Sequence, residues 1–140
     1  MANKNHSLLF YLLGAAFLIY YSGSASAQTL QDFMWKHRLI AVVANSNSNL
    51  LSDVTDLSTR YACEFKDRDL KIVHVTIGSP IWTEISRKIN VRDGLYLIGY
   101  DGQIKDTSSD LSLLSRVNNV IDKMPMRRAE LSKRDCKNIC

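Results

Sequence analysis

The residues of this chain best suited to covalent chemistry are its three cysteines, Cys63, Cys136 and Cys140. In an oxidising compartment cysteines pair as disulfides, and an odd number leaves one thiol free or bonded to another molecule. In a regular helix the four-residue spacing of Cys136 and Cys140 sets their Cβ atoms about 5–6 Å apart, whereas a disulfide needs about 3.5–4.5 Å. These two cysteines therefore bond to each other only where a helix has frayed, and a bond from Cys63 to either one is equally open.

Cys63 is also placed to act as a nucleophile. The basic residues Arg60, Lys66 and Arg68 lie close to it in the sequence and would favour its thiolate form. This arrangement suits a divergent thiol-dependent peroxidase or reductase in which Cys136 or Cys140 resolves the oxidised Cys63. A lone cysteine near a helix end is more often a disulfide partner or a half-buried small residue, and we favour that structural role.

The other residues that could support catalysis or metal binding lack the partners that such chemistry needs. Cys136 and Cys140 have no second ligand pair nearby, as a zinc site would require. His74 lies in the middle of a predicted strand, where a structural role is commoner than that of a base. No serine, histidine and carboxylate set can be assembled from spacing. The sequence therefore predicts no catalytic residue, no metal and no cofactor.

A strand, a tight turn and a second strand stand at the centre of the chain. Residues 94–100 form an apolar run typical of a strand that is buried on both faces. Asp101 and Gly102 both tolerate positive φ, as a two-residue type I′ hairpin requires. Residues 103–107 are short and mostly polar, which is typical of a strand at the edge of a sheet.

Strands and helices alternate around this hairpin. A central strand is predicted over residues 38–44 and a partly alternating strand over residues 70–77. Amphipathic helices are predicted over residues 50–63, 80–89 and 111–124, followed by a basic helix over residues 126–140. The first two strands, joined by a helix, should lie parallel through a right-handed crossover. We therefore predict an α/β fold with a four-stranded mixed sheet and helices on both faces, in the element order of the thioredoxin-like fold.

The corner that carries the reactive thiols of a thioredoxin holds other residues in this chain. The corner lies where the first strand meets the first helix, because the helix N-terminus stabilises a thiolate. Here its sequence is Asn45-Ser46-Asn47-Ser48, a cap and turn sequence whose free amides could at most hold an anion. Residues 90–93 also lack the proline that precedes the third strand of thioredoxins. Both differences argue against dithiol chemistry at the usual site.

The first 27 residues have the features of a secretory signal peptide. Lys4 provides a positive start, residues 8–21 are apolar, and Ala25-Ser26-Ala27 forms a typical cleavage site. The apolar run is shorter than the roughly 20 residues of a membrane-spanning helix, and an uncleaved anchor is the alternative. We therefore expect a periplasmic or secreted protein with a single domain over residues 28–140.

The charge of the chain gives little information about partners. The formal net charge is +4, and the basic residues near the C-terminal end alternate with acidic ones. Such mixing is typical of a solvated helix face rather than a nucleic-acid site. We expect no nucleic-acid partner and no membrane contact beyond the signal peptide, which leaves an unidentified protein or a small anionic ligand.

Two segments resemble the signatures of a known family. Residues 97–105 (LIGYDGQIK) and 121–130 (IDKMPMRRAE) are similar to those of the DUDES domain family, as is Arg68-Asp69-Leu70. This family comprises thioredoxin-like domains of unknown function in sushi-repeat-containing and coiled-coil-domain-containing extracellular proteins of animals, and the chain most resembles its small stand-alone bacterial members. The resemblance spans residues 28 to about 134. It implies a peroxiredoxin- or thioredoxin-like fold and suspected links to oxidative stress or matrix adhesion, but no reaction.

The second of these segments also suggests a contact between distant parts of the chain. Pro125 should begin a helix, from which Arg127 or Arg128 could reach Asp101 or Asp106 at the hairpin, because a planar guanidinium suits bidentate pairing with a carboxylate. These four residues are candidates for a structural clamp, or secondarily for an anion or partner site. The expected function is a non-catalytic binding or stress-response module; the alternatives are the thiol enzyme at Cys63 and a membrane-attached adhesion module.

Overall fold

The computed structural model describes residues 27–45 and 48–133. Almost all of the predicted signal peptide, and both Cys136 and Cys140, lie outside these described residues. The elements of the described chain are η1 (Leu30–Asp32), β1 (Arg38–Val43), α1 (Leu50–Arg60), α2 (Ala62–Asp67), β2 (Leu70–Val75), α3 (Pro80–Ser86), β3 (Gly94–Ile98), β4 (Ile104–Ser108), α4 (Ser112–Asp122) and α5 (Pro125–Lys133).

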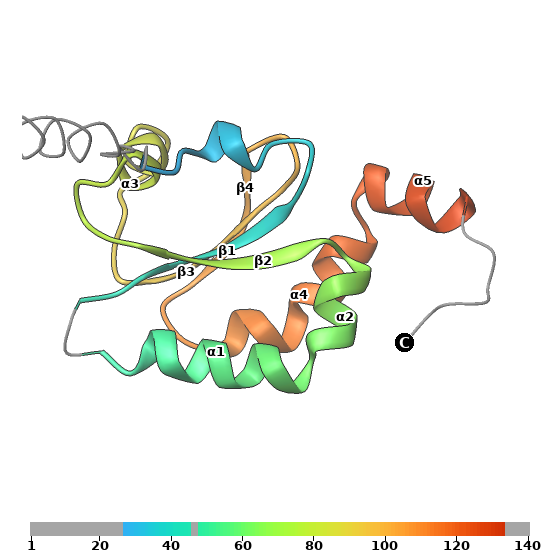
Figure 1. Ribbon diagram of the computed structural model, residues 1–140, viewed down its shortest axis with the longest axis horizontal. Helices are drawn as coiled ribbons and strands as arrows, with labels where there is room; N and C mark the ends of the chain where they lie inside the picture. Colours follow the sequence, from blue (N-terminus) through green and yellow to red (C-terminus); the bar gives the residue numbers. More distant parts are fainter. Residues whose placement is uncertain (1–26, 46–47, 134–140) are drawn as a thin grey trace, which may run out of the picture.

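The four strands form one mixed sheet in the order β2-β1-β3-β4 (Figure 1). β1 and β2 are parallel and pair from Arg38–Leu70 to Val43–Val75. β3 is antiparallel to both of its neighbours, β1 and β4. The predicted α/β fold, its element order and its mixed sheet are therefore confirmed, and the arrangement is that of a thioredoxin-like fold.

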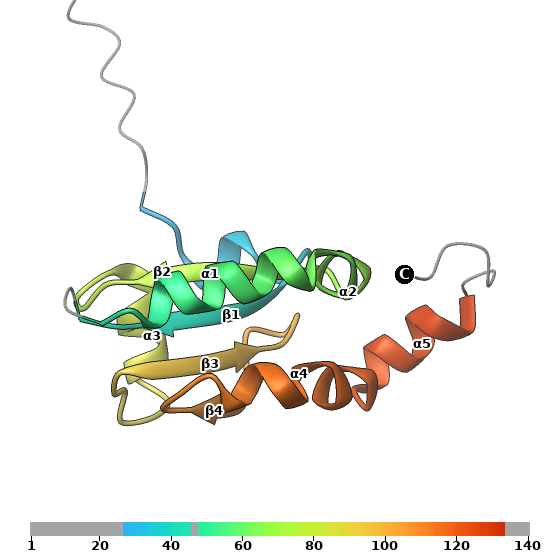
Figure 2. The same cartoon turned by 90° about the horizontal axis from the view of Figure 1, so that it is seen from below.

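Helices cover both faces of the sheet because side chains on β1 and β3 alternate between two apolar clusters. α1, α2 and α4 pack on one face, which lies at the bottom in Figure 1, and α1 and α4 run side by side there (Figure 2). η1 and α3 pack on the other face. The first face buries Ile40, Val42, Leu95 and Leu97, and the second buries Leu39, Ala41, Val43, Tyr96 and Ile98. All six residues of β1 and all five of β3 are buried, as the unbroken apolar runs predict.

The turn between β3 and β4 differs from the prediction. It is a three-residue loop, in which Gly102 N–H donates to the Gly99 carbonyl at 3.0 Å and Gly99 N–H donates to the Gln103 carbonyl at 2.9 Å. Gly102 has a φ of +69°, whereas Asp101 is not among the residues with positive φ. A two-residue type I′ turn at Asp101 and Gly102 is therefore wrong. The reason is that Tyr100 leaves the strand to make contacts at the end of the sheet, so it belongs to the loop.

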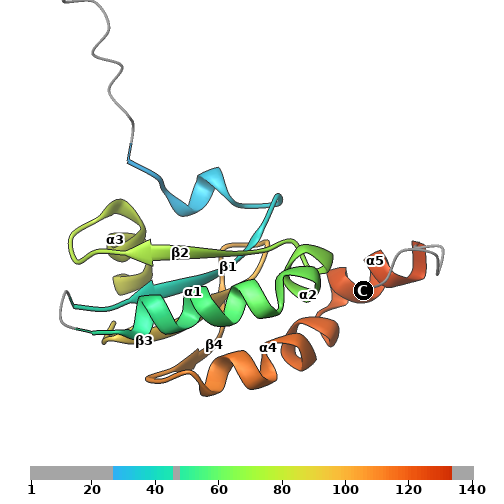
Figure 3. The same cartoon turned by 60° about the horizontal axis from the view of Figure 1, so that its bottom comes forward.

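Two further boundaries differ from the predicted elements. The helix expected over residues 50–63 is divided at Tyr61, so that Cys63 lies on the short α2. α5 follows α4 beyond the end of the sheet (Figure 3), and its described part matches the first residues of the predicted basic helix. Within the described part of the chain, no helix is both long and apolar enough to cross a membrane.

Candidate functional site

Arg38, the first residue of β1, is fully buried, with 0% of its surface exposed. A buried guanidinium needs hydrogen bonds and an opposite charge, because removing it from water is costly. Its Nη2 donates to Glu130 Oε1 at 2.8 Å, and its Nη1 donates to the Arg68 carbonyl at 2.8 Å and to Glu130 Oε2 at 3.4 Å. The guanidinium carbon also lies 4.0 Å from the centroid of the Tyr100 ring, a cation–π contact.

Arg127 of α5 is the second buried guanidinium, with 1% of its surface exposed. It forms an ion pair with the Asp67 carboxylate and donates to the Asp67 carbonyl at 2.8 Å. Its Nε donates to Asp122 Oδ1 at 3.2 Å, and its Nη1 lies 3.4 Å from Glu130 Oε2. Glu130 therefore contacts both buried arginines and joins them into one network.

Arg68 is the third arginine of this network. Its Nε and Nη2 donate to the two oxygens of Asp122 at 3.1 Å and 2.7 Å, a bidentate pair, and its Nη1 donates to the Glu64 carbonyl at 3.2 Å. Burial tends to raise the pKa of Asp122, but Arg68 and Arg127 outweigh it and hold that pKa below its usual value. We call Arg38, Arg68, Arg127, Asp67, Asp122 and Glu130 the arginine network.

Tyr100 connects this network to the hairpin. Its hydroxyl donates to Asp69 Oδ2 at 2.7 Å, and its carbonyl accepts from the Trp35 N–H at 2.9 Å. Burial, together with the bond to Asp69, raises the pKa of Tyr100 well above its ordinary value. The phenol therefore stays neutral and presents the face of its ring to Arg38.

The structure does not bring the four clamp candidates together. Arg127 is buried and paired, but its carboxylates come from α2, α4 and its own helix rather than from the hairpin. Asp101 instead pairs with Lys105 at 2.7 Å, and Asp106 pairs with Arg116 of α4 at 2.7 Å. Arg128 is exposed. The predicted pairing of an arginine with the hairpin is thus wrong in its partners, because each hairpin carboxylate finds a nearer cation.

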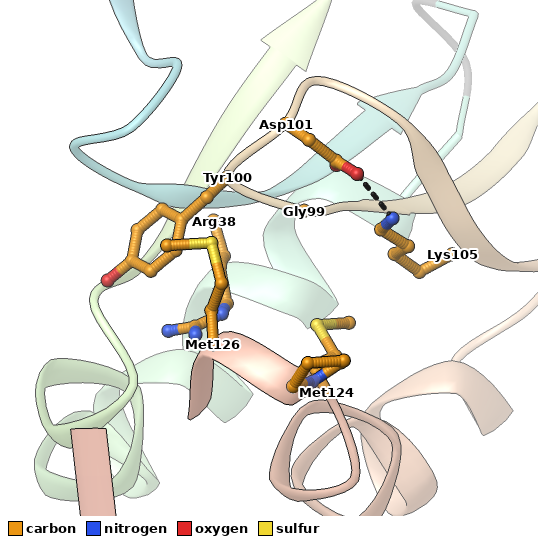
Figure 4. Close-up of a pocket in the computed structure, with 8 residues that line it drawn as sticks. Arg38, Gly99, Tyr100, Asp101, Lys105, Met124 and Met126 are labelled. Carbon is orange, nitrogen blue, oxygen red and sulfur yellow. Dashed lines mark hydrogen bonds and ion pairs between the residues drawn. The ribbon is translucent and has the colours of Figure 1, made fainter. Parts of the chain in front are cut away.

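A pocket of about 330 Å³ opens beside Arg38, between the hairpin and the start of α5 (Figure 4). It is lined by Arg38, Gly99, Tyr100, Asp101, Lys105, Met124, Pro125 and Met126. The thioether side chains of Met124 and Met126 form part of the pocket wall. Lys105 Nζ donates a hydrogen bond to the Asp101 carboxylate across the hairpin. Among the described residues, Arg38 Nε has no hydrogen-bond partner. A buried donor left unpaired costs about 1–3 kcal/mol, so the pocket offers an acceptor a place to bind.

This pocket lies at the opposite end of β1 from the corner where a thioredoxin carries its thiols. Arg38 begins β1, whereas Asn45 follows the end of the strand and donates through its side chain to Asp93 Oδ2 at 2.9 Å. Cys63 is separated from that corner by the 11 residues of α1, a length of about 16 Å. The described part of this corner, Asn45 and Ser48, therefore holds an amide and a hydroxyl, and Cys63 lies beyond the far end of α1.

The surroundings of Cys63 differ from those expected of an activated thiol. Its side chain lies on an exposed part of α2, and Arg68, one of the three nearby cations expected to favour a thiolate, is held by Asp122. His74, on β2, is exposed. Among the described residues, no group of three or more histidine, cysteine, aspartate or glutamate side chains is arranged to hold a metal ion.

Sequence reasoning missed Arg38, Tyr100 and Glu130 as site residues. A signal was present for Arg38, because a charged residue opens a strand whose other residues are all apolar. In a sheet covered on both faces such a residue must meet a carboxylate. The sequence did not indicate which carboxylate, because Glu130 lies 92 residues away.

The three segments that carry the sequence resemblance meet in this site. The first supplies Tyr100 and Lys105, the second supplies Asp122, Arg127 and Glu130, and the third supplies Arg68. A comparison with protein-family models matches residues 29–130 to a domain of unknown function, DUF4174. No curated protein matches the chain. The matched stretch ends at Glu130, the last residue of the arginine network, and the chain belongs to the DUF4174 family.

Proposed function

We propose that this domain is a non-catalytic binding module whose ligand occupies the pocket beside Arg38. The observation that carries the proposal is a buried guanidinium that lines an apolar pocket and keeps one donor, Nε–H, without a partner among the described residues. Small-molecule sites are typically concave and mostly apolar, with a few fixed polar groups. The pocket beside Arg38 has this composition.

The arginine network supports this function because it fixes the position of Arg38. Glu130 and the Arg68 carbonyl hold the two Nη atoms, and the Tyr100 ring lies against the guanidinium plane. A group that is already held in its binding geometry loses little conformational freedom when a ligand arrives. Arg38 is therefore suited to recognition of a ligand.

The absence of catalysis is supported by the placement of the thiols. The corner after β1 has no cysteine in its sequence, and Cys63 lies beyond the far end of α1, about 16 Å along the helix. The alternative, a thiol peroxidase that uses Cys63 with Cys136 or Cys140, would need a cation free to stabilise the thiolate. Of the three basic residues near Cys63 in the sequence, Arg68 binds Asp122 instead.

We also propose that residues 1–27 are a signal peptide, that the mature protein is periplasmic or secreted, and that Cys63 forms a disulfide with Cys136 or Cys140. Support for the disulfide comes from α5, because Arg127 holds this helix to Asp67, one helical turn after Cys63. Cys136 follows only three residues after the end of α5 at Lys133. On the same basis as the sequence resemblance, we propose that this family corresponds to the stand-alone bacterial type of the DUDES domain.

The disulfide and export are tested on protein taken directly from its compartment. The expected mass is that of a chain beginning at Gln28, with one cysteine alkylated before reduction and three afterwards. Alkylation of all three cysteines before reduction would contradict the disulfide, and a mass that includes residues 1–27 would contradict cleavage.

The binding function is tested with the isotope-labelled mature protein and a mixture of small organic fragments. We expect amide NMR shifts to concentrate at Gly99, Tyr100, Lys105 and Met124. Peroxide consumption should be negligible and equal in wild type and Cys63→Ser. Shifts spread over the whole surface would contradict the binding site, and peroxide turnover that disappears in Cys63→Ser would support the enzyme instead.

A further inference from the structure

We propose that the pocket binds a small monocarboxylate with an apolar body, and that the carboxylate is received by the free edge of the Arg38 guanidinium. This inference rests on the proposed binding function and specifies the chemical class of the ligand. Three features of the pocket carry it: the unused donors of Arg38, the charges of the lining side chains, and the size and character of the walls.

The donors of Arg38 identify the edge that remains available. A guanidinium carries five N–H donors, arranged so that each edge matches the two oxygens of a carboxylate. Glu130 meets both Nη1 and Nη2 and therefore occupies the end of the group, while the Arg68 carbonyl takes a further N–H of Nη1. The side edge of the guanidinium, formed by Nε–H and the adjacent N–H of Nη2, therefore remains available to a ligand. Arg38 Nε has no partner among the described residues.

The charges of the lining side chains favour an anion over a cation. Arg38 and Lys105 are positive, and Asp101 is the one carboxylate among the residues that line the pocket. That carboxylate is already engaged, because it accepts from Lys105 Nζ at 2.7 Å and from the Gln103 N–H at 3.0 Å. An incoming cation would meet Arg38 without a free carboxylate, whereas an incoming anion would find unpaired donors.

The walls of the pocket require that the rest of the ligand be apolar and small. Met124, Pro125, Met126 and Tyr100 supply apolar lining, and Figure 4 shows the thioethers of Met124 and Met126 and the ring of Tyr100. Unbranched thioethers adapt to the shape of an apolar group and contact aromatic rings favourably. The volume of about 330 Å³ is at the lower end of ligand sites, which extend to about 1,000 Å³. The other charged lining residues, Lys105 and Asp101, already pair with each other, so a ligand with a single carboxylate fits best.

The experiment is a titration of the labelled mature protein with hexanoate and, separately, with 1-hexanol. The two probes share an apolar chain and differ in the carboxylate. We expect hexanoate to shift the amides of Gly99, Tyr100, Lys105 and Met124. Hexanol should bind the same pocket about tenfold more weakly, because it cannot form a charge-assisted bidentate pair.

Two matched variants of α5 test where the carboxylate binds. Met126 lines the pocket and is 45% exposed, so Met126→Glu should fold and should weaken hexanoate binding at least tenfold by like-charge repulsion. Leu131→Glu makes the same charge change on the same helix, at a residue that is 39% exposed and does not line the pocket. We expect this variant to bind hexanoate within twofold of wild type.

The outcomes separate this inference from the proposed function. Hexanol that binds the pocket as tightly as hexanoate would overturn the carboxylate class and leave the binding module intact. Hexanoate binding that Met126→Glu leaves unchanged would also overturn it. If other fragments shift the pocket amides while hexanoate does not, the class is wrong and the proposed function stands. If neither hexanoate nor any fragment shifts them, both fail.

Discussion

At the scale of single residues, two arginines of the described chain, Arg38 and Arg127, are fully buried and have different roles. Arg127 uses its donors on Asp67, Asp122 and Glu130, and so joins α5 to α2 and α4. Arg38 keeps one donor without a partner among the described residues and lines a pocket. Removing one partner of a buried ion pair is strongly destabilising, because the other charge remains buried and uncompensated.

Replacement of Arg127 and of its neighbour should therefore have very different effects. We expect Arg127→Met to lower the free energy of unfolding by about 3 kcal/mol, because the buried Asp67 carboxylate would lose its direct ion pair and retain Arg68 Nη1 at 3.6 Å. Arg128→Met, at an exposed position of the same helix, should stay within about 0.5 kcal/mol of wild type. Urea denaturation of the two variants measures the difference, and equal stabilities would contradict a structural role for Arg127.

The sequence predicted an ion pair from Arg127 or Arg128, but it indicated neither which arginine is buried nor which carboxylates it meets. The fixed fork of the guanidinium and the position after Pro125 pointed to an ion pair with a distant carboxylate. The hypothesis chose Asp101 or Asp106, whereas Lys105 and Arg116 pair with them. Choice among several carboxylates depends on how α5 is oriented, and that orientation is set by tertiary contacts that a one-dimensional pattern does not contain.

At the scale of elements, α5 is held to the rest of the domain by polar contacts rather than by an apolar face. Its only buried residue is Arg127, so it docks through ion pairs and hydrogen bonds rather than through an apolar stripe. The hairpin beside it is likewise shaped by one side chain, because Tyr100 contacts Arg38 and Asp69 instead of continuing β3. The strands of the hairpin were predictable from apolar runs, but the turn type was not, because it depends on where Tyr100 finds its partners.

Alanine substitutions at two glycines, Gly102 in the hairpin turn and Gly78 after β2 as a control, test the packing of this turn. Gly102 and Gly78 have φ values of +69° and +82°, a region that costs a side-chain-bearing residue about 1–2 kcal/mol. A Cβ at Gly102 would also lie 3.2 Å from Met34 Sδ, whereas nothing lies within 4 Å of one at Gly78. Thermal unfolding should therefore show Gly102→Ala to be less stable than Gly78→Ala, and the reverse order would contradict the packing of Met34 against the turn.

At the scale of the whole molecule, the fold was more predictable than the site. Unbroken apolar runs identified β1 and β3, and helical spacing identified the covering helices, so the thioredoxin-like order followed from local patterns. The pocket joins residue 38 to residues 99–105 and 124–126, segments that no local pattern relates. The one indication of this site in the sequence was a charged residue, Arg38, at the start of a strand that is otherwise apolar.

The ion pairs of Asp106 and Asp122 predict how the stability of the molecule depends on pH. The hydrogen bond from Arg116 lowers the pKa of Asp106. Burial would raise the pKa of Asp122, but Arg68 and Arg127 lower it overall. On acidification the unfolded chain, with ordinary values of about 3.9, takes up protons before the folded one. The stabilisation is therefore complete above about pH 4 and is lost as pH falls through the lowered folded values.

We expect the urea midpoint to fall steeply with pH in this acid range and to change less steeply in Asp122→Asn. That variant has no carboxyl group at position 122 to titrate, so part of the proton uptake on unfolding disappears. An unchanged slope in the variant would show that Asp122 does not contribute to the acid sensitivity.

The pairing of Arg38 with Glu130 has a consequence for how the protein is made. The two residues are separated by 92 positions, and the chain is synthesised from its N-terminus. The central strand is therefore present long before the carboxylate that neutralises its first residue. Until Glu130 has left the ribosome, Arg38 has no carboxylate from α5 to pair with, so β1 cannot be buried with its native ion pair before α5 has been synthesised.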